Sequence, residues 1–328
     1  MSVIDARPFV GKHCESTTLV NLLRQRGIDL SEPLVFGLGS GLSFGYWHTK
    51  KMPTPFIGGR IKPDRLTANI ANSLDLRLTV RETSSPKRAR GHLVDGLDSG
   101  TVVGLKLDRF HLDYSTDRYR FAAHYVACVG HEDDRFALVE TRPLGLQWAS
   151  GDALARARDA GGPMSSRNLS FTIDPPEGSL PDLGDVARQS IRATAEDFLN
   201  PPISNFGFRG MRKAADLMPD WMDNLESPEE ALIEISTIME DGGTGGGLFR
   251  MMWADFLAEA ADLTDVPEFR DLSDAYRVVS GKWTDVADLL REAGTASSRG
   301  PVDQAAELVR ELAEEERHLM RQLLECSQ

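Results

Sequence analysis

The feature that most constrains the fold is a change of pattern about halfway along this chain of 328 residues. After residue 182, apolar residues recur at steps of three and four, which is the spacing of amphipathic helices. Before residue 149, one such helix is followed by short runs of β-prone residues. The pattern predicts an α+β protein with two domains: residues 1–148, which mix helix and strand, and residues 149–328, which are mainly helical.

The second half contains five predicted helices, and the last of them is strongly amphipathic. Its apolar residues follow one side and glutamate and arginine fill the other, so it suits a core position or an interface between two copies in a homodimer. The preceding segment, 149–181, is rich in Gly, Pro, Ser and Asp and predicts a connection with one short helix at 152–158. The five helices are predicted at 183–199, 228–239, 248–263, 283–291 and 302–324.

The first half contains several strand-like runs. Short β-prone runs occur at 34–36 and 101–107. The runs at 123–129 and 136–141 predict an antiparallel pair, because the polar segment 130–134 between them has the composition of a hairpin turn.

Composition excludes several classes of function. A net charge of -13 opposes binding to a phosphate backbone, so no nucleic-acid partner is expected. No apolar run approaches the length of a membrane span and the first residues lack a secretory signal, which predicts a cytoplasmic protein without a membrane partner. The three cysteines are unclustered and the histidines lack ligand spacing, so neither a disulfide framework nor a bound metal is expected.

Cys14 is the first candidate for chemistry. It directly precedes a predicted helix, for which Ser16 is the expected N-cap and Gly27 the expected stop signal. A thiol at a helix N-terminus faces unpaired N–H groups and the positive end of the helix dipole, and both favour the nucleophilic thiolate. The competing interpretation is a buried structural cysteine.

A cysteine nucleophile needs a base, and His124 is the candidate. It opens a predicted strand, from which its ring can take the thiol proton and later return it to a leaving group. Glu140 ends the next predicted strand, so across the hairpin its carboxylate can orient the imidazole and stabilise its cation. A histidine without a catalytic part and a solvated glutamate are the competing interpretations.

Two glycine-rich segments are further candidates. Segment 36–44 lacks the spacing of a nucleotide-binding fingerprint and instead predicts close backbone packing beside a cleft. Glu32 could line that cleft, or it could pair with a basic residue at the surface. Segment 242–247 precedes a predicted helix, so N–H groups of Gly245 and Gly246, assisted by Arg250, could hold an anion such as the phosphate of phosphopantetheine. A flexible loop is the alternative for this second segment.

Several of these motifs, in this order, resemble the butirosin biosynthesis protein H (BtrH) family. The resemblance covers most of the chain, because the second half looks like the helical region that accompanies the family's N-terminal domain. The stretches that carry it are His13–Leu19, Ser31–Glu32, Phe36–Phe44, Asp108–Tyr114, His124–Gly130, Asn205–Gly207 and Gly242–Arg250.

The resemblance implies a papain-like N-terminal domain in which Cys14 is the nucleophile, His124 the base and Glu140 the orienting group. Related hydrolases carry Asp or Asn at the third position, and no glutamine precedes Cys14 to form an oxyanion hole. Backbone N–H groups at Cys14 are expected in that role, with Ser40 as a side-chain candidate and Gly39 beside the cleft.

The function expected from the resemblance is acyl transfer. An acyl or aminoacyl group would pass from a thioester on an acyl carrier protein or coenzyme A to Cys14, and then to a small-molecule amine in natural-product biosynthesis. No cofactor is expected, because the phosphopantetheine-linked donor is a substrate. A peptidase, amidase or thioesterase using the same residues, or a non-catalytic binding protein on the same fold, are the alternatives.

Overall fold

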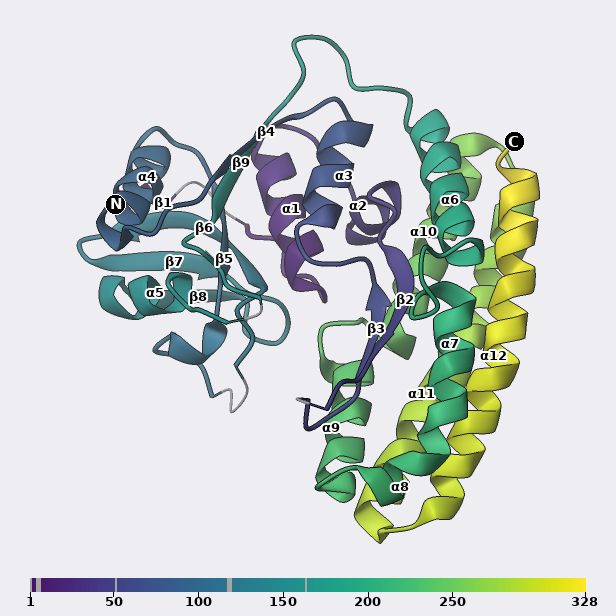
Figure 1. Ribbon diagram of the computed structural model, residues 1–328. Coiled ribbons are helices and arrows are strands. Elements are labelled where there is room, and N and C mark those ends of the chain that lie inside the picture. The colour runs from purple at the N-terminus through teal and green to yellow at the C-terminus, as the bar shows by residue number, and fades with distance from the viewer. Residues whose placement is uncertain (1, 4–6, 51, 117–119, 163) are drawn as a thin grey trace. The chain divides into compact units, whose positions relative to one another are not determined.

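The computed structural model describes residues 2–3, 7–50, 52–116, 120–162 and 164–328, and it divides into two compact units. The first unit comprises Met1–Val35 and Pro63–Pro181, and the second comprises Phe36–Lys62 and Asp182–Gln328. These units do not follow the predicted boundary at residues 148/149, because a strand after residue 149 joins the sheet of the first unit. The first unit contains that sheet and the second is mainly helical, so the chain is a mixed α and β protein (Figure 1).

The first unit is built on an antiparallel sheet of seven described strands. Its helices and strands are β1 (Ser2–Val3), α1 (Cys14–Gln25), α3 (Arg65–Ser73), β4 (Arg77–Arg81), α4 (Pro86–Asp98), β5 (Val103–Leu107), η1 (Arg109–His111), β6 (His124–Glu132), β7 (Arg135–Val139), β8 (Leu146–Ser150), α5 (Gly151–Arg158) and β9 (Ser170–Asp174). Helix α2 (Glu32–Leu38) crosses the boundary between the units.

The strands follow the order β4-β9-β5-β6-β7-β8, and β1 also pairs with β6. Strands β6 and β7 form a hairpin whose register pairs Ala127 with Val139. Because the two strands are antiparallel, the first residue of β6, His124, and the residue after β7, Glu140, lie at the same end of the sheet. The fold thereby sets the base and the carboxylate near each other.

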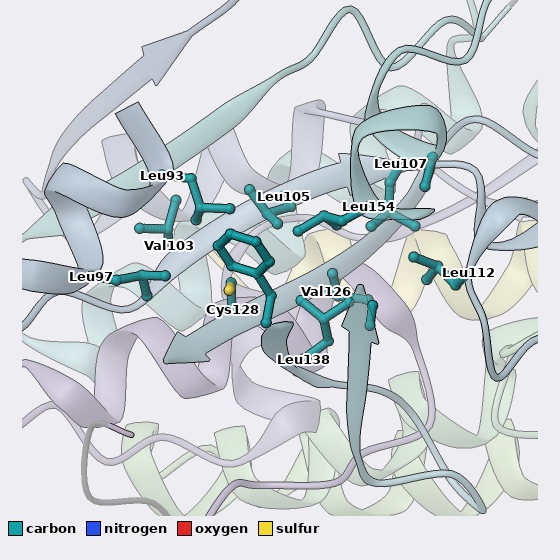
Figure 2. Packing of buried hydrophobic residues seen from close by; sticks show 13 residues of the cluster. Leu93, Leu97, Val103, Leu105, Leu107, Leu112, Val126, Cys128, Leu138 and Leu154 are labelled. Carbon is teal, nitrogen blue, oxygen red and sulfur yellow. The ribbon is translucent and has the colours of Figure 1, made fainter. Parts of the chain in front are cut away.

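One face of this sheet forms a core with α4 and α5. Figure 2 shows Leu93 and Leu97 of α4 packed with Val103 and Leu105 of β5 and with Cys128 of β6. Alternate residues of β6 point to opposite faces, and those of the other face are buried as well. Helix α1 packs against β6 and β5, so the helix that begins with Cys14 lies directly on the sheet that carries the base.

The second unit is a set of packed helices with one β-hairpin. Its elements are β2 (Leu42–Trp47), β3 (Phe56–Arg60), α6 (Leu183–Leu199), α7 (Gly207–Leu217), η2 (Met218–Asp220), α8 (Trp221–Asn224), α9 (Pro228–Asp241), η3 (Gly247–Phe249), α10 (Arg250–Thr264), α11 (Glu268–Ala296) and α12 (Arg299–Cys326). Helices α11 and α12 run side by side, and the hairpin packs against α6, α7 and α9 (Figure 1).

The structure confirms most of the predicted elements. The helix at 183–199 and the hairpin of β6 and β7 are present, and the predicted helices at 152–158 and 302–324 fall within α5 and α12. The prediction of a strand at 34–36 is wrong, because these residues lie in α2. The Ser31 hydroxyl accepts the N–H of Leu34 at 3.1 Å and so stabilises the start of this helix. The segment 149–181 is more than a connection, since it contributes α5 and β9.

Candidate active site

Cys14 is the first residue of α1, which begins three residues earlier than the predicted N-cap Ser16 would place it. His13 is the N-cap: its backbone is extended and its Nδ1 accepts the N–H of Ser16 at 3.4 Å. Ser16 therefore lies inside the helix, and the prediction that it is the cap is wrong. The prediction that Gly27 follows the end of the helix is confirmed by its φ of 77° beyond the C-cap Arg26. Cys14 thus lies in the first turn, where unsatisfied N–H groups and the helix dipole stabilise an anion.

A buried carboxylate, Glu32, fixes the backbone on both sides of Cys14. Its side chain accepts hydrogen bonds from four donors, namely two backbone N–H groups before the cysteine and two hydroxyl groups after it. The donors are the N–H groups of Lys12 (2.9 Å) and His13 (2.9 Å) and the hydroxyls of Ser16 (2.9 Å) and Thr17 (3.2 Å). Glu32 is only 5% exposed. The structure therefore places Glu32 as a clamp on the Cys14 segment rather than as an open lining of a cleft.

Gly11 shows how tightly this clamp is packed. A Cβ added at Gly11 would lie 2.4 Å from the Thr17 hydroxyl oxygen and 2.7 Å from the Glu32 carboxyl group. Any side chain at residue 11 would push the carboxylate away from its donors. In the sequence, the Ser31–Glu32 motif was the only indication of this clamp, and the motif alone does not show which groups Glu32 contacts.

His124 lies between Cys14 and Glu140. Its Nε2 is 2.8 Å from Oε2 of Glu140, and its side chain is also hydrogen-bonded to the side chain of Cys14. The Glu140 side chain is fully buried, and its backbone N–H donates to Gly145 O at 2.9 Å, which fixes the chain where β7 ends. The structure brings the three predicted catalytic residues together within the first unit.

The charges of this group are mutually dependent. Burial lowers the pKa of His124, but the charge of Glu140 and the hydrogen bonds to Cys14 and Glu140 outweigh burial and raise it to about 10. Burial likewise raises the pKa of Glu140, but His124 and Arg109 outweigh it and lower that pKa below its usual range. At neutral pH the imidazole is therefore cationic and the carboxylate anionic, and a cation hydrogen-bonded to Cys14 favours the thiolate.

Two further residues hold Glu140, and the sequence did not assign a role to either. The Tyr114 hydroxyl donates to Oε1 of Glu140 at 2.8 Å, and Nη1 of Arg109 lies 4.0 Å from Oε2. Burial, followed by the negative charge of Glu140, raises the pKa of Tyr114, so the phenol remains a donor. The only earlier signal was that both residues belong to the stretch Asp108–Tyr114 of the family resemblance.

The other two cysteines have different surroundings. All three are free thiols. Cys128 is part of the core in Figure 2, where burial raises its pKa to about 12, and burial also raises the pKa of Cys326 at the end of α12. Neither environment favours a thiolate, so Cys14 is the cysteine suited to nucleophilic chemistry.

Gly39 and Ser40 belong to the second unit, in the turn after α2. Ser40 has a φ of 52°, and its hydroxyl donates to Ser190 O at 3.4 Å. Their expected place beside the nucleophile stays a prediction. Backbone N–H groups in the first turn of α1 are the candidates for an oxyanion hole within the first unit itself.

The structure places Arg250, the expected helper of an anion site, in the core of the helical unit. Arg250 is fully buried, and its guanidinium is bonded to Glu316 (Nη2–Oε2 3.0 Å) and to Leu248 O (2.9 Å). In the glycine-rich loop, the N–H of Gly246 donates to Thr244 Oγ1, and that of Gly247 donates to a glutamate carboxylate, Glu240 Oε1. The guanidinium is thus a core group of the helical unit, and Gly245 and Gly246 lack its help in holding an anion.

The described residues contain neither a metal-binding cluster nor a membrane-spanning helix. No group of three or more His, Cys, Asp and Glu side chains there is arranged to hold a metal ion. No helix in this part of the chain combines the length and apolar character needed to span a membrane.

A thiol at a helix start, an imidazole and a buried carboxylate, in this order, make up a candidate cysteine-based active site. The chain belongs to the family described as "Domain of unknown function (DUF4872)", whose model matches residues 152–323, and it carries a "Butirosin biosynthesis protein H, N-terminal" domain at residues 13–141. The N-terminal match begins one residue before Cys14 and ends one residue after Glu140, so it encloses all three site residues. No curated protein is similar enough to this chain to count as a match.

Proposed function

We propose that this protein is a cysteine-dependent acyltransferase that forms an acyl-enzyme on Cys14. The observation that carries the proposal is the hydrogen-bonded series Cys14–His124–Glu140, in which the imidazole contacts both the thiol and the carboxylate. The N-terminal family model is named for a protein of butirosin biosynthesis, which supports a biosynthetic enzyme rather than a degradative one. The papain-like fold implied by the resemblance fits the same chemistry.

The first half-reaction transfers the acyl group to the protein. The Cys14 thiolate attacks the thioester carbonyl, and a bond forms between Sγ and the acyl carbon while the carbonyl oxygen takes up the electron pair. N–H groups at the start of α1 stabilise that oxyanion. The bond to the donor sulfur then breaks, and the His124 imidazolium gives its proton to the departing thiolate, so the donor leaves as a thiol.

The second half-reaction delivers the acyl group to an amine. The amine nitrogen attacks the acyl carbon, and the now neutral His124 accepts the proton that this nitrogen loses. The bond to Sγ breaks and restores the thiolate beside the imidazolium. Exchange between thioesters is nearly neutral in free energy and amide formation is favourable, so the cycle needs no ATP. Glu140 remains a carboxylate throughout and holds the imidazole in place.

The proposed donor is a phosphopantetheine thioester on an acyl carrier protein or coenzyme A, and the proposed acceptor is a small-molecule amine. The helical unit would supply the surfaces for these partners. Hydrolysis uses the same acyl-enzyme with water in place of the amine, so the two outcomes differ only in how well the loaded site excludes water.

The experiment compares the wild-type protein with Cys14→Ala and with Cys326→Ala as the matched control. An acyl-pantetheine thioester is offered with and without a panel of amines, and the products are identified by mass spectrometry. We expect amide in the wild type and in the control and none with Cys14→Ala. Free acid in place of amide with every amine would instead identify a hydrolase, and full transfer by Cys14→Ala would exclude the mechanism.

A further inference from the structure

The hairpin of β2 and β3 has one buried and one exposed face. Phe44, Tyr46 and Ile57 point towards the helices and are at most 3% exposed. The residues of the opposite face alternate with them, and Trp47 and Phe56, paired directly across the strands, are 44% and 42% exposed. The hairpin therefore presents large apolar side chains to the solvent.

The chain segment before α7 extends this exposed face. Asn205 is bonded to both backbone groups of Tyr46, through its own carbonyl (2.9 Å) and its side-chain amide (2.8 Å). Phe206 follows, 38% exposed, with its ring against Gly45, where an added Cβ would lie 3.2 Å from the ring. We call Trp47, Phe56 and Phe206 the aromatic face.

The two segments that supply the aromatic face carry a charge of opposite sign to that of the whole chain. Segment 36–62 contains four Lys and Arg residues and no Asp or Glu, and segment 200–213 contains three and again none. The chain as a whole has 50 acidic residues and a net charge of -13. Exposed apolar groups on two segments that have Lys and Arg but no Asp or Glu are suited to an acidic protein partner with an apolar contact surface.

We propose that the aromatic face is the docking surface for an acidic protein, and that this protein is the carrier of the acyl donor. The choice of the carrier as the partner rests on the proposed function, whereas the preference for an acidic partner rests on the charges alone. Aromatic side chains supply the contact area with little loss of side-chain entropy, and the surrounding Lys and Arg residues set the orientation and the rate of association.

Two other occupants fit the structure less well. A symmetric homodimer through this face would set the basic region of one copy against the same region of the other. An anionic membrane is flat, so it would also face α9, which packs against β3 and carries five acidic residues. Glu234 of α9 accepts the Thr54 hydroxyl at 2.9 Å, so this acidic helix directly borders the hairpin tip. A protein partner can contact the aromatic face without covering α9.

The experiment separates docking from chemistry. Binding of a holo-acyl carrier protein of bacterial fatty-acid synthesis, used as the acidic probe, is measured by fluorescence anisotropy with the full-length Cys14→Ala protein at low and high salt. Trp47→Ser and Lys50→Glu are introduced on the aromatic face and its rim, and Val278→Ser and Lys87→Glu serve as matched controls on exposed sites of α11 and α4. Vesicles of phosphatidylglycerol are the second probe. Transfer from the carrier and from acyl-pantetheine is then measured in proteins that retain Cys14.

We expect Trp47→Ser to weaken carrier binding by about thirtyfold and Lys50→Glu by about fivefold, with higher salt weakening the wild type and the controls unchanged. Transfer from acyl-pantetheine should remain, because a small donor needs no docking surface. Absence of carrier binding, equal binding by all variants, or loss of vesicle binding in the same variants would overturn the proposal. If no thioester donor supports transfer, the proposed function fails, while the binding measurements still decide the docking surface.

Discussion

Replacing Glu140 with glutamine tests how the charge of His124 is set. The substitution keeps the shape of the side chain, and its amide oxygen can still accept the Tyr114 hydroxyl, but the negative charge 2.8 Å from Nε2 of His124 is lost. Burial lowers the pKa of His124, and without the charge of Glu140 only Cys14 and the remaining hydrogen bond still raise it. We expect the imidazole of Glu140→Gln to be neutral at pH 7 and the imidazole of the wild type to be cationic.

The magnitude follows from the pKa of His124. Raising it from 6.5 to about 10 corresponds to about 5 kcal/mol in favour of the imidazolium. Because the pKa is raised in the folded protein, this stabilisation is fully present below about pH 6.5 and is lost as the pH rises through about 10. Glu140 acts in the opposite direction: its lowered pKa stabilises the fold above about pH 4.5, and that contribution is lost as the pH falls. The stability difference between wild type and Glu140→Gln should therefore be largest between these limits.

The assay follows both the imidazole and the thiolate. NMR titration reports the pKa of His124, and the rate of alkylation of Cys14 by iodoacetamide, read by peptide mass spectrometry, reports the thiolate. In the wild type we expect alkylation to remain fast at pH 6, whereas in Glu140→Gln it should rise only towards an ordinary thiol pKa of about 8.5. Glu132→Gln, at the exposed end of β6, is the matched control. An unchanged pKa of His124 in Glu140→Gln would refute the reasoning.

Three further substitutions test the supports of the site and of the helical unit, each by urea denaturation. Glu32→Ala should cost about 3 kcal/mol or more because it leaves buried donors beside Cys14 unpaired, and an unchanged midpoint would exclude the clamp. Tyr114→Phe should cost about 1 kcal/mol and raise the pKa of Glu140, because the hydrogen bond from the phenol lowers that pKa, whereas a loss of all activity would mean that the phenol takes part in the chemistry. Glu316→Gln should cost about 3–5 kcal/mol because Arg250 keeps a buried charge without its partner, and a neutral result would show that this charge is compensated elsewhere.

The sequence predicted the elements whose signal is local. Helix α6 repeats apolar residues over four turns, and the hairpin of β6 and β7 is marked by a polar turn between two β-prone runs. The three candidate catalytic residues followed from similar local cues, namely a thiol before a helix and polar residues at strand ends. The contact between His124 and Glu140 then follows from the antiparallel pairing of two consecutive strands, whereas the contact of His124 with Cys14 also requires α1 to pack against β6.

Features that depend on distant partners were not predictable. Strand β9 is a run of five residues after a glycine- and serine-rich stretch, and it becomes a strand because β4 and β5 pair with it. Arg250 follows a glycine-rich loop and resembles an anion ligand, but its partner Glu316 is 66 residues away in the sequence. The local sequence around one residue carries no information about such contacts with distant segments.

The contacts of Glu140 could not be predicted from the sequence for the same reason. Tyr114 lies in a loop without periodicity, 26 residues before the carboxylate that it donates to. The Glu32 clamp likewise joins residues that are 15 to 20 positions apart in the sequence. Nothing in the local sequence marks the serine and threonine hydroxyls as its donors. Sequence reasoning therefore located the reactive groups but missed the residues that hold them.

The most direct test of the account is the mass of the protein after exposure to an acyl-pantetheine thioester without any amine. Rapid acid quenching, proteolysis and mass spectrometry then locate the added group. We expect one acyl group on the peptide that contains Cys14. This group should be absent from His124→Ala and should be released as an amide when an amine is added. No acyl group at Cys14, or an equal amount on Cys326, would contradict the account.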